Sequence, residues 1–315
     1  MASKMLFTPF KPMEPVAASS VPQGECFLYQ VKWDGVRIVA HTGNGRVLLH
    51  NRKLRERTHH YPELNNLKDF CTGGAIFDGE VVAFRQDRPS FPLVLERDLV
   101  LPSGTVKMRR LMKLVPISYL VFDIIFYNGR SLVHTPLRSR QDILAEVLPE
   151  TDYIQRVENF YDGITLFEAV KEKKFEGIVA KETESSYVAG KKLPVWQKIK
   201  VRQKQLAAVG GYTLNSGQVK ALLAGAYYKG QFICLGRVAS GLSSRELAEL
   251  TPFLKATAMS ASPFANEEAA KDKVWVEPKL TMLLEFQEWT EDLRMRQPVI
   301  KGFTKDRPED CVLDR

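Results

Sequence analysis

The sequence predicts a two-domain α+β protein, in which a mixed domain built on antiparallel sheets is followed by a small β-barrel. Three observations lead to this prediction. The chain has 315 residues, more than the roughly 100 to 200 residues of one typical domain. Its first 200 residues combine strand-like and helical patterns, whereas the remainder consists mainly of strand-like runs joined by glycine turns. We therefore place the domains at residues 1–200 and 201–315.

The first domain opens with strand-like alternation over residues 27–50, interrupted by a turn at Gly43-Asn44-Gly45. Further strand-like runs cover residues 75–84, 117–127, 177–181 and 195–200. Helical patterns cover residues 138–148 and 164–174. Residues 88–114 show no dominant pattern, and their structure is left open.

The second domain contains strand-like runs at residues 206–213, 220–241 and 279–289, and one helical pattern at residues 243–258. About five short strands with one intervening helix fit an OB-type barrel, a fold that commonly carries nucleic-acid backbones. We expect the domain boundary between residues 201 and 205.

Composition favours a globular protein with a polyanionic partner. Hydrophobic residues make up 44% of the chain, which excludes wholesale disorder. The net charge of +8 fits nucleic acid, although basic surface charge also serves solubility alone. No apolar run is long enough for a signal peptide or a membrane span, so we expect a cytoplasmic protein, and a monomer. None of its four cysteines forms a C-x-x-C pair, which argues against a zinc site.

Five clusters that could carry chemistry stand on or beside the predicted strands of the first domain. Each alone has a plain structural explanation, such as a solvated lysine, a turn or a core aromatic ring. Their occurrence together, in this order, favours one shared chemical site. The clusters are Lys32-Trp33-Asp34-Gly35-Val36-Arg37, Asp78-Gly79-Glu80, Phe122-Asp123, Glu176-Gly177-Ile178-Val179-Ala180-Lys181 and Trp196-Gln197-Lys198-Ile199-Lys200.

This ordered set resembles the covalent nucleotidyltransferase superfamily, which contains ATP-dependent DNA ligases, RNA ligases and mRNA capping enzymes and shares K-x-D-G at the nucleophile. Residues 185–213 and 236–243 resemble more narrowly the ligase part of bacterial end-joining ligases of the ligase D type. The resemblance implies an adenylation domain followed by an OB-fold domain. It also implies that the protein is a bacterial ATP-dependent DNA ligase, which seals 3′-hydroxyl/5′-phosphate breaks through lysyl-AMP and adenylated DNA.

The resemblance assigns Lys32 as the nucleophile that attacks the α-phosphate of ATP, expels pyrophosphate and holds AMP. An unperturbed lysine is mostly ammonium at neutral pH, so the site must favour the neutral amine through nearby cations or desolvation. Lys198 and Lys200 lie two apart on one predicted strand, so both charges can face the phosphates. The resemblance assigns Glu176 to a metal ion and Glu80 to the ribose or a metal. Mg²⁺ is the expected ion, with Mn²⁺ as a substitute.

The resemblance assigns four further residues to nucleotide or substrate binding. Arg37 and Arg52 match positions that contact the sugar and the phosphate of the strand to be sealed. Phe122 matches the ring that stacks on adenine, with a plain core role as the alternative. Arg296, within residues 294–303 of the terminal motif, is assigned to the departing phosphates.

Three positions depart from the family pattern. Gln30 stands where many relatives carry an acidic residue, and Lys192 stands where ligase D proteins usually have arginine. Thr304 replaces a basic residue of the terminal motif, although Lys305 and Arg307 are close by. These departures bear on how lysyl-AMP forms from ATP, and none of them removes a reacting group.

Two other functions stay open. The K-x-D-G core alone also fits an RNA ligase or a capping-type enzyme, and a ligase descendant that retained only its basic cleft would be a non-catalytic DNA-binding scaffold. The expected partner is nicked or broken double-stranded DNA, with a Ku-type end-binding protein as a further hypothesis. The length leaves no room for a polymerase or nuclease module, so we expect those activities from other chains. Nick repair and end joining are not distinguished.

Overall fold

The computed structural model describes residues 5–69, 73–100, 105–148, 150–215, 217–268, 270–290 and 292–313. The chain divides into two compact units, Met1–Val201 and Arg202–Arg315. The predicted α+β class is confirmed, because the first unit combines sheets with helices and the second is built mainly of strands. No helix in the described ranges is long and apolar enough to cross a membrane.

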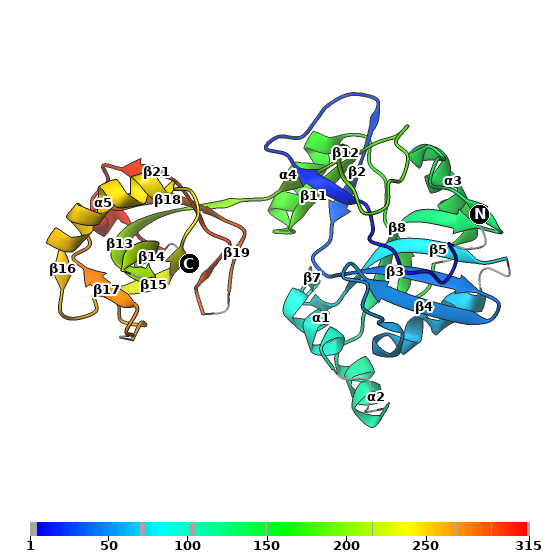
Figure 1. Ribbon diagram of the computed structural model, residues 1–315, viewed down its shortest axis with the longest axis horizontal. Coiled ribbons are helices and arrows are strands. Elements are labelled where there is room, and N and C mark those ends of the chain that lie inside the picture. The colour runs from blue at the N-terminus through cyan, green and yellow to red at the C-terminus, as the bar shows by residue number, and fades with distance from the viewer. Residues whose placement is uncertain are drawn as a thin grey trace. The chain divides into compact units, whose positions relative to one another are not determined.

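A six-stranded sheet, mostly antiparallel, forms one half of the first unit (Figure 1). The predicted turn joins two of its strands, and φ is positive at both Asn44 and Gly45, as a tight hairpin requires. Two 3-10 helices, Thr58–His60 and Pro62–Asp69, pack beneath it. The strands are β3 (Val36–Gly43), β4 (Arg46–Asn51), β5 (Ala75–Val82), β8 (Ser118–Tyr127), β9 (Arg130–Ser131) and β10 (Ile154–Arg156).

A four-stranded sheet forms the other half of this unit. Its strands in spatial order are β1 (Glu14–Ala17), β12 (Lys192–Lys200), β11 (Gly177–Glu182) and β2 (Phe27–Lys32). Helix α4 (Gly163–Glu172) covers one face, where Leu166 and Val170 join Ile178 in a hydrophobic cluster. The Asp162 side chain caps this helix by accepting from the N–H groups of its first turn.

Two pairings differ from the predicted antiparallel arrangement. Strands β1 and β12 run parallel, and so do β8 and β10. Helix α3 (Leu137–Val147) lies in the long connection between β8 and β10, and a crossover of this kind makes parallel pairing feasible. Local sequence patterns do not reveal such a connection, because the direction of pairing depends on the path of the chain.

Of the segment that the sequence left open, residues 88–100 and 105–114 are described, and they form a short strand and two helices, the first of which is held in place by tertiary ion pairs. Both oxygens of Glu63 accept from Arg97 Nη2 at 2.9 Å, and Arg57 Nε donates to Asp98 Oδ1 at 2.7 Å. These partners lie more than 30 residues away in the sequence, so no local pattern records them. The elements in and beside the segment are β6 (Phe84–Arg85), β7 (Arg88–Pro89), α1 (Phe91–Asp98) and α2 (Thr105–Leu114).

Five strands of the second unit close into a barrel, which confirms the predicted OB-type fold. They are β13 (Gln203–Asn215), β14 (Gln218–Tyr228), β15 (Gln231–Val238), β18 (Thr281–Phe286) and β21 (Val299–Thr304). The long strand β13 pairs with both β14 and β18, and β18 pairs with β21. A bridge between Ser240 and Val299, next to a hydrogen bond from Ile300 N–H to the Ser240 carbonyl at 2.9 Å, closes the ring.

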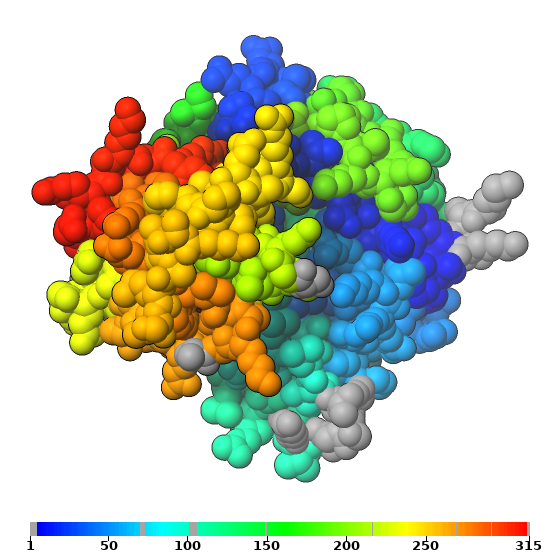
Figure 2. All heavy atoms as spheres, turned by 60° about the vertical axis from the view of Figure 1, so that its left-hand side comes forward, coloured from blue at the N-terminus to red at the C-terminus, as the bar shows by residue number. Residues whose placement is uncertain are grey.

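Helix α5 (Ser244–Ala256) lies on the surface of this barrel, yellow to gold in Figure 2. Ser243 and Glu246 form a capping box at its start, and Leu254 is its buried anchor. The remaining elements are β16 (Ala258–Met259), β17 (Lys273–Val276), β19 (Glu288–Trp289), β20 (Met295–Arg296) and the 3-10 helix Pro308–Asp310.

A fully buried ion pair ties α3 to the six-stranded sheet. Arg140 Nε and Nη2 donate to the two oxygens of Asp123 at 2.8 Å, and both side chains are 0% exposed. Arg140 Nη1 also donates to the carbonyls of Thr135 and Ser185. Removing one partner would leave the other charge buried without compensation.

We expect Arg140→Leu to lower the free energy of unfolding by about 3 to 5 kcal/mol, because Asp123 loses its buried counter-charge. The control is Arg138→Leu on the same helix, whose ion pair with Glu184 is 66% and 59% exposed. That change should cost no more than about 1 kcal/mol. Urea denaturation of both variants tests this, and equal losses would contradict it.

Candidate active site

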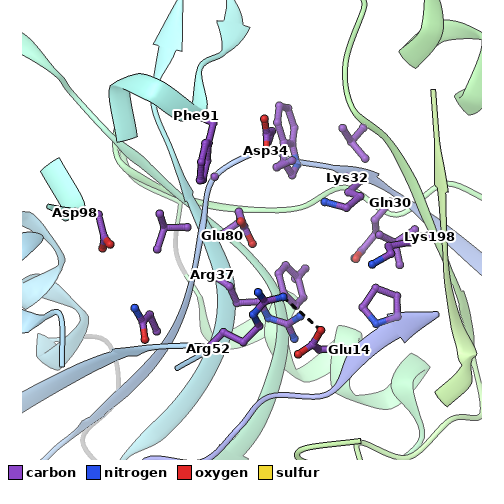
Figure 3. Close-up of a pocket in the computed structure, with 18 of the residues that line it drawn as sticks. Glu14, Gln30, Lys32, Asp34, Arg37, Arg52, Glu80, Phe91, Asp98 and Lys198 are labelled. Carbon is purple, nitrogen blue, oxygen red and sulfur yellow. Dashed lines mark hydrogen bonds and ion pairs between the residues drawn. The ribbon is translucent and has the colours of Figure 1, made fainter. Parts of the chain in front are cut away.

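A cavity of about 510 Å³ in the first unit is lined by residues from both sheets and from α1. Strands β2, β11 and β12 contribute from one sheet, and β3, β5 and β8 from the other. Figure 3 labels several of the charged side chains of this cavity. Six residues predicted from the sequence line it, namely Lys32, Arg37, Arg52, Glu80, Phe122 and Lys198.

The two remaining predicted residues of this unit, Glu176 and Lys200, adjoin the cavity through Lys32. Glu176 Oε2 lies 2.5 Å from Lys32 Nζ, and Glu176 Oε1 lies 2.8 Å from Lys200 Nζ. Strand register explains this grouping, because Lys32 and Lys200 both stand opposite Gly177 on either side of β11. Burial raises the pKa of Glu176, but the charges of Lys32 and Lys200 outweigh that effect and hold the pKa below its ordinary value. Glu176 is therefore an ionised carboxylate shared by two ammonium groups.

Gly177 is required beside this carboxylate for two reasons. Its φ of +150° is rarely adopted by residues with side chains, and an added Cβ would collide with the carbonyl oxygen of Ile199. Gly35, in the first cluster, meets a similar limit, because a Cβ there would collide with the carbonyl oxygen of Val81. Both glycines let a neighbouring strand approach the charged residues closely.

Glu80 is a second carboxylate of the cavity, and its ionisation is poised near neutrality. Burial raises its pKa to about 7, although the charges of Lys32 and Arg37 act in the opposite direction. Glu176 and Asp34 raise the pKa further through like-charge repulsion. A cation placed near Glu80 and Glu176 would stabilise both carboxylates.

Arg37 is tied into the wall of the cavity. Its Nε and Nη2 donate to the two oxygens of the buried Asp78 at 2.8 and 2.6 Å. Its Nη2 also donates to the Met13 carbonyl at 2.9 Å, and the Tyr187 hydroxyl donates to Asp78 at 2.7 Å. Most of the hydrogen-bonding capacity of Arg37 therefore serves the structure of the wall.

Phe122 lies close to two cations on the cavity wall. The Arg37 guanidinium lies 4.8 Å from the centre of its ring, and Lys181 Nζ lies 4.5 Å away. Lys181 Nζ is also 4.3 Å from the Trp196 ring. The ring of Phe122 thus lines the cavity instead of belonging wholly to the core.

The exposed Arg52 and the partly buried Lys198 supply positive charge to the cavity. Arg52 Nη1 lies 3.4 Å from Glu14 Oε2, at the start of β1. Burial lowers the pKa of Lys198, and the charges of Lys192 and Lys32 lower it further. This crowding of like charges favours a bound anion.

Arg296 belongs to the second unit. It lies on β20 and pairs with Glu288 Oε1 on β19 at 2.5 Å. Its role toward ATP stays a prediction.

The three departures from the family pattern have ordinary surroundings. Gln30 is buried on the cavity wall, where its amide donates to Asn159 Oδ1 at 2.7 Å and to Gln141 Oε1 at 3.4 Å. Lys192 is exposed at the start of β12. The Thr304 hydroxyl donates to that of Thr281 at 2.9 Å, within the barrel.

Three charged residues near the cavity, Lys181, Asp78 and Glu14, carry no role that the sequence predicts. Lys181 could have been found by strand alternation, since it shares a face of β11 with Val179, and both line the cavity. Asp78 was part of a recognised cluster, but nothing in the sequence pairs it with Arg37. Glu14 belongs to no motif, and only the parallel pairing of β1 with β12 brings it here.

Two family models match the chain. The model described as "ATP dependent DNA ligase domain" matches residues 4–200, and the model described as "ATP dependent DNA ligase C terminal region" matches residues 215–307. The first match alone covers more than half of the chain.

Curated relatives and solved structures are similar to this chain. The multifunctional non-homologous end joining protein LigD of Mycolicibacterium smegmatis is 29% identical over 90% of the chain and 37% of that protein. A DNA ligase of Thermococcus fumicolans is 28% identical over 89% of the chain and 52% of that protein. The chain thus spans only part of these relatives. A structure titled "mycobacterial DNA ligase D complexed with ATP and MES" is 27% identical with a TM-score of 0.55, covering 97% of this chain and 98% of that one.

We expect Lys181 to make stability depend on pH. Burial lowers its pKa from 10.5 to about 7, so between these values the folded protein holds fewer protons than the unfolded chain. The cost of the buried charge is therefore complete below pH 7 and is relieved as the pH rises toward 10. Relative to Lys181→Met, the wild type should gain roughly 1 to 4 kcal/mol of unfolding free energy over that interval.

Denaturant titrations of the wild type and Lys181→Met at several pH values measure this difference. Lys171→Met, at a side chain that is 57% exposed, is the control, and its difference from the wild type should stay flat with pH. A flat profile for Lys181→Met as well would show that Lys181 does not titrate as the geometry implies.

Proposed function

The chain belongs to the ATP-dependent DNA ligase family, and from this premise we propose that it seals 3′-hydroxyl/5′-phosphate breaks in double-stranded DNA with Lys32 as its nucleophile. One observation carries the proposal. Lys32 lines a cavity while its amine and that of Lys200 share the carboxylate of Glu176. This grouping joins a nucleophile, a counter-charge and a phosphate-binding cation at one place.

In the first step, the Lys32 amine attacks the α-phosphorus of ATP. A phosphorus–nitrogen bond forms, the bond to pyrophosphate breaks, and the attacking nitrogen loses its extra proton. The ion pair between Lys32 and Glu176 must open for this attack, because only an uncharged amine has a free electron pair. Lys198 and Lys200 place positive charge around the amine, where it attracts the phosphates of ATP.

Glu176 and Glu80 are the residues that would hold a divalent cation. Within the described ranges no three histidine, cysteine, aspartate or glutamate side chains form a metal cluster. A site of two carboxylates suits Mg²⁺, or Mn²⁺ as a substitute, because substrate phosphates and waters complete its coordination. When bound, the ion supplies positive charge that neutralises the triphosphate.

The rest of the nucleotide meets groups around the cavity. The Phe122 ring stacks on adenine, and the outer nitrogen of Arg37 that is not used for Asp78 or Met13 serves the sugar or phosphate. Arg52 and Lys198 bind phosphate oxygens. Arg296 acts on the departing phosphates from the second unit.

AMP then passes from Lys32 to the 5′-phosphate of the break, and the 3′-hydroxyl displaces AMP to form the new phosphodiester. Positioning and fixed charge do most of this work, since phosphoryl transfer asks for little other chemistry from side chains. The net charge of +8 supports DNA as the partner.

The first experiment follows label from α-labelled ATP and Mg²⁺ into the protein, resolved under denaturing conditions, and then into nicked DNA. The wild type should carry covalent label that disappears as the nick is sealed. Lys32→Ala should carry none, because no other amine occupies its position. The control Lys171→Ala changes an exposed lysine on α4 and should label like the wild type.

The same assay separates the alternatives. Labelling by GTP in place of ATP would indicate a capping-type enzyme, and transfer of label only to RNA ends would indicate an RNA ligase. If neither the wild type nor Lys32→Ala acquires label and both still bind DNA, the protein is a non-catalytic DNA-binding scaffold.

Lys200→Met should slow lysyl-AMP formation by roughly 100-fold, because Glu176 and the phosphates lose a fixed positive charge. Lys200→Arg should recover part of the rate, since it retains the charge with a different shape. Single-turnover labelling measures both, with Lys171→Met as the control. If Lys200→Met forms lysyl-AMP at the wild-type rate, Lys200 does not assist this step.

A Ku-type end-binding protein is the proposed partner if the chain acts in end joining. Its addition should stimulate sealing of blunt and cohesive ends more than sealing of nicks. Equal sealing of ends with and without such a protein would contradict this partnership.

A further inference from the structure

Glu14 carries a negative charge into a cavity whose other exposed groups are mainly cationic. It is the first residue of β1, and its carboxylate lies beside the guanidinium of Arg52 (Figure 3). The distance from Glu14 Oε2 to Arg52 Nη1 is 3.4 Å. Arg52 and Lys198 are the residues proposed above to bind phosphate. Glu14 therefore stands where these cations would attract an anionic substrate most strongly.

The backbone around Glu14 is firmly placed. The Glu14 N–H donates to the Lys191 carbonyl at 2.9 Å, and the preceding Met13 carbonyl accepts from Arg37 at 2.9 Å. The Met13 N–H donates to the Tyr187 hydroxyl at 3.0 Å. The position of Glu14 is therefore set by the cavity wall and not by a loose terminal segment.

Glu14 acts on two cations at once. It pairs directly with Arg52, and its charge also raises the pKa of Lys198 against the stronger effects of burial and neighbouring lysines. The pair with Arg52 is long and partly exposed, with 36% of the Glu14 side chain and 59% of the Arg52 side chain open to solvent. Ion pairs of this kind are weak in water, so an anion of higher charge can displace the carboxylate.

We propose that the Glu14 carboxylate competes with phosphate groups for the cations Arg52 and Lys198. This competition disfavours the return of pyrophosphate once Lys32 carries AMP. This inference rests on the proposed ligase function. In the reverse reaction a pyrophosphate oxygen bonds to the α-phosphorus of lysyl-AMP, the phosphorus–nitrogen bond breaks, and ATP and the Lys32 amine are restored. Every negative charge fixed near Arg52 and Lys198 weakens binding of the pyrophosphate that starts this reversal.

The test compares Glu14→Gln with the wild type, because glutamine keeps the shape of the side chain and removes its charge. Protein that carries no AMP is titrated with pyrophosphate in a calorimeter, without metal. The dissociation constant should be roughly 3- to 10-fold lower for Glu14→Gln than for the wild type. The control is Glu56→Gln, which removes the same charge from an exposed side chain that does not line the cavity. Its affinity should equal that of the wild type.

A second measurement uses protein carrying labelled AMP on Lys32. The pyrophosphate concentration that discharges half of the label should fall by a similar factor in Glu14→Gln and stay unchanged in Glu56→Gln. Unaltered or weaker pyrophosphate binding by Glu14→Gln, in protein with an unchanged melting temperature, would overturn the proposal. Weaker binding would mean that Glu14 instead orients Arg52 for phosphate.

The two proposals fail in different ways. If the wild type never acquires label from ATP, the ligase function fails, whereas the titration with pyrophosphate still decides whether Glu14 competes with phosphate. If labelling succeeds and the titrations of wild type and Glu14→Gln coincide, only the role of Glu14 is lost.

Discussion

The site depends on the double ion pair that the Glu176 carboxylate forms with Lys32 and Lys200. These two lysines stand on the two strands that flank β11. This arrangement needs both strands in one register and needs Gly177 for their close approach. A shift of either strand by one residue would turn its lysine to the opposite face of the sheet. The four-stranded sheet thus brings Lys32, Lys200 and Glu176 together.

Two arginines, one of the six-stranded sheet and one of α3, are each paired with a buried carboxylate. Arg37 and Asp78 neutralise each other in the wall, and Arg140 and Asp123 do so beneath it. Lys181 Nζ lies against two aromatic rings and 3.5 Å from the Phe122 carbonyl, and burial lowers its pKa although the charge of Asp123 acts in the opposite direction. The Arg37–Asp78 pair is part of the cavity wall, whereas the pair between Arg52 and Glu14 is longer and more exposed.

The mouth of the cavity adds a separate electrostatic effect. Arg52 and Lys198 attract anions, and Glu14 opposes that attraction from within the same surface. An enzyme that binds a triphosphate and then releases pyrophosphate gains from an affinity that is not too high, because tight product binding would slow the next step. Charges of both signs in one cavity provide such a balance.

The sequence by itself determined the fold class, the OB-type barrel and the cluster around Lys32, because strand alternation, glycine turns and short motifs are local properties. The family resemblance carried by these motifs also singled out Glu176, whose carboxylate lies between the amines of Lys32 and Lys200. Only the tertiary structure decided the conformation of residues 88–100 and 105–114, the parallel pairing of β1 and the presence of Glu14 at the cavity. These features rest on contacts between residues far apart in the chain, such as the bond from Met13 to Tyr187 across 174 positions. A local pattern carries no record of such a contact, because its energy arises only when the sheets have assembled.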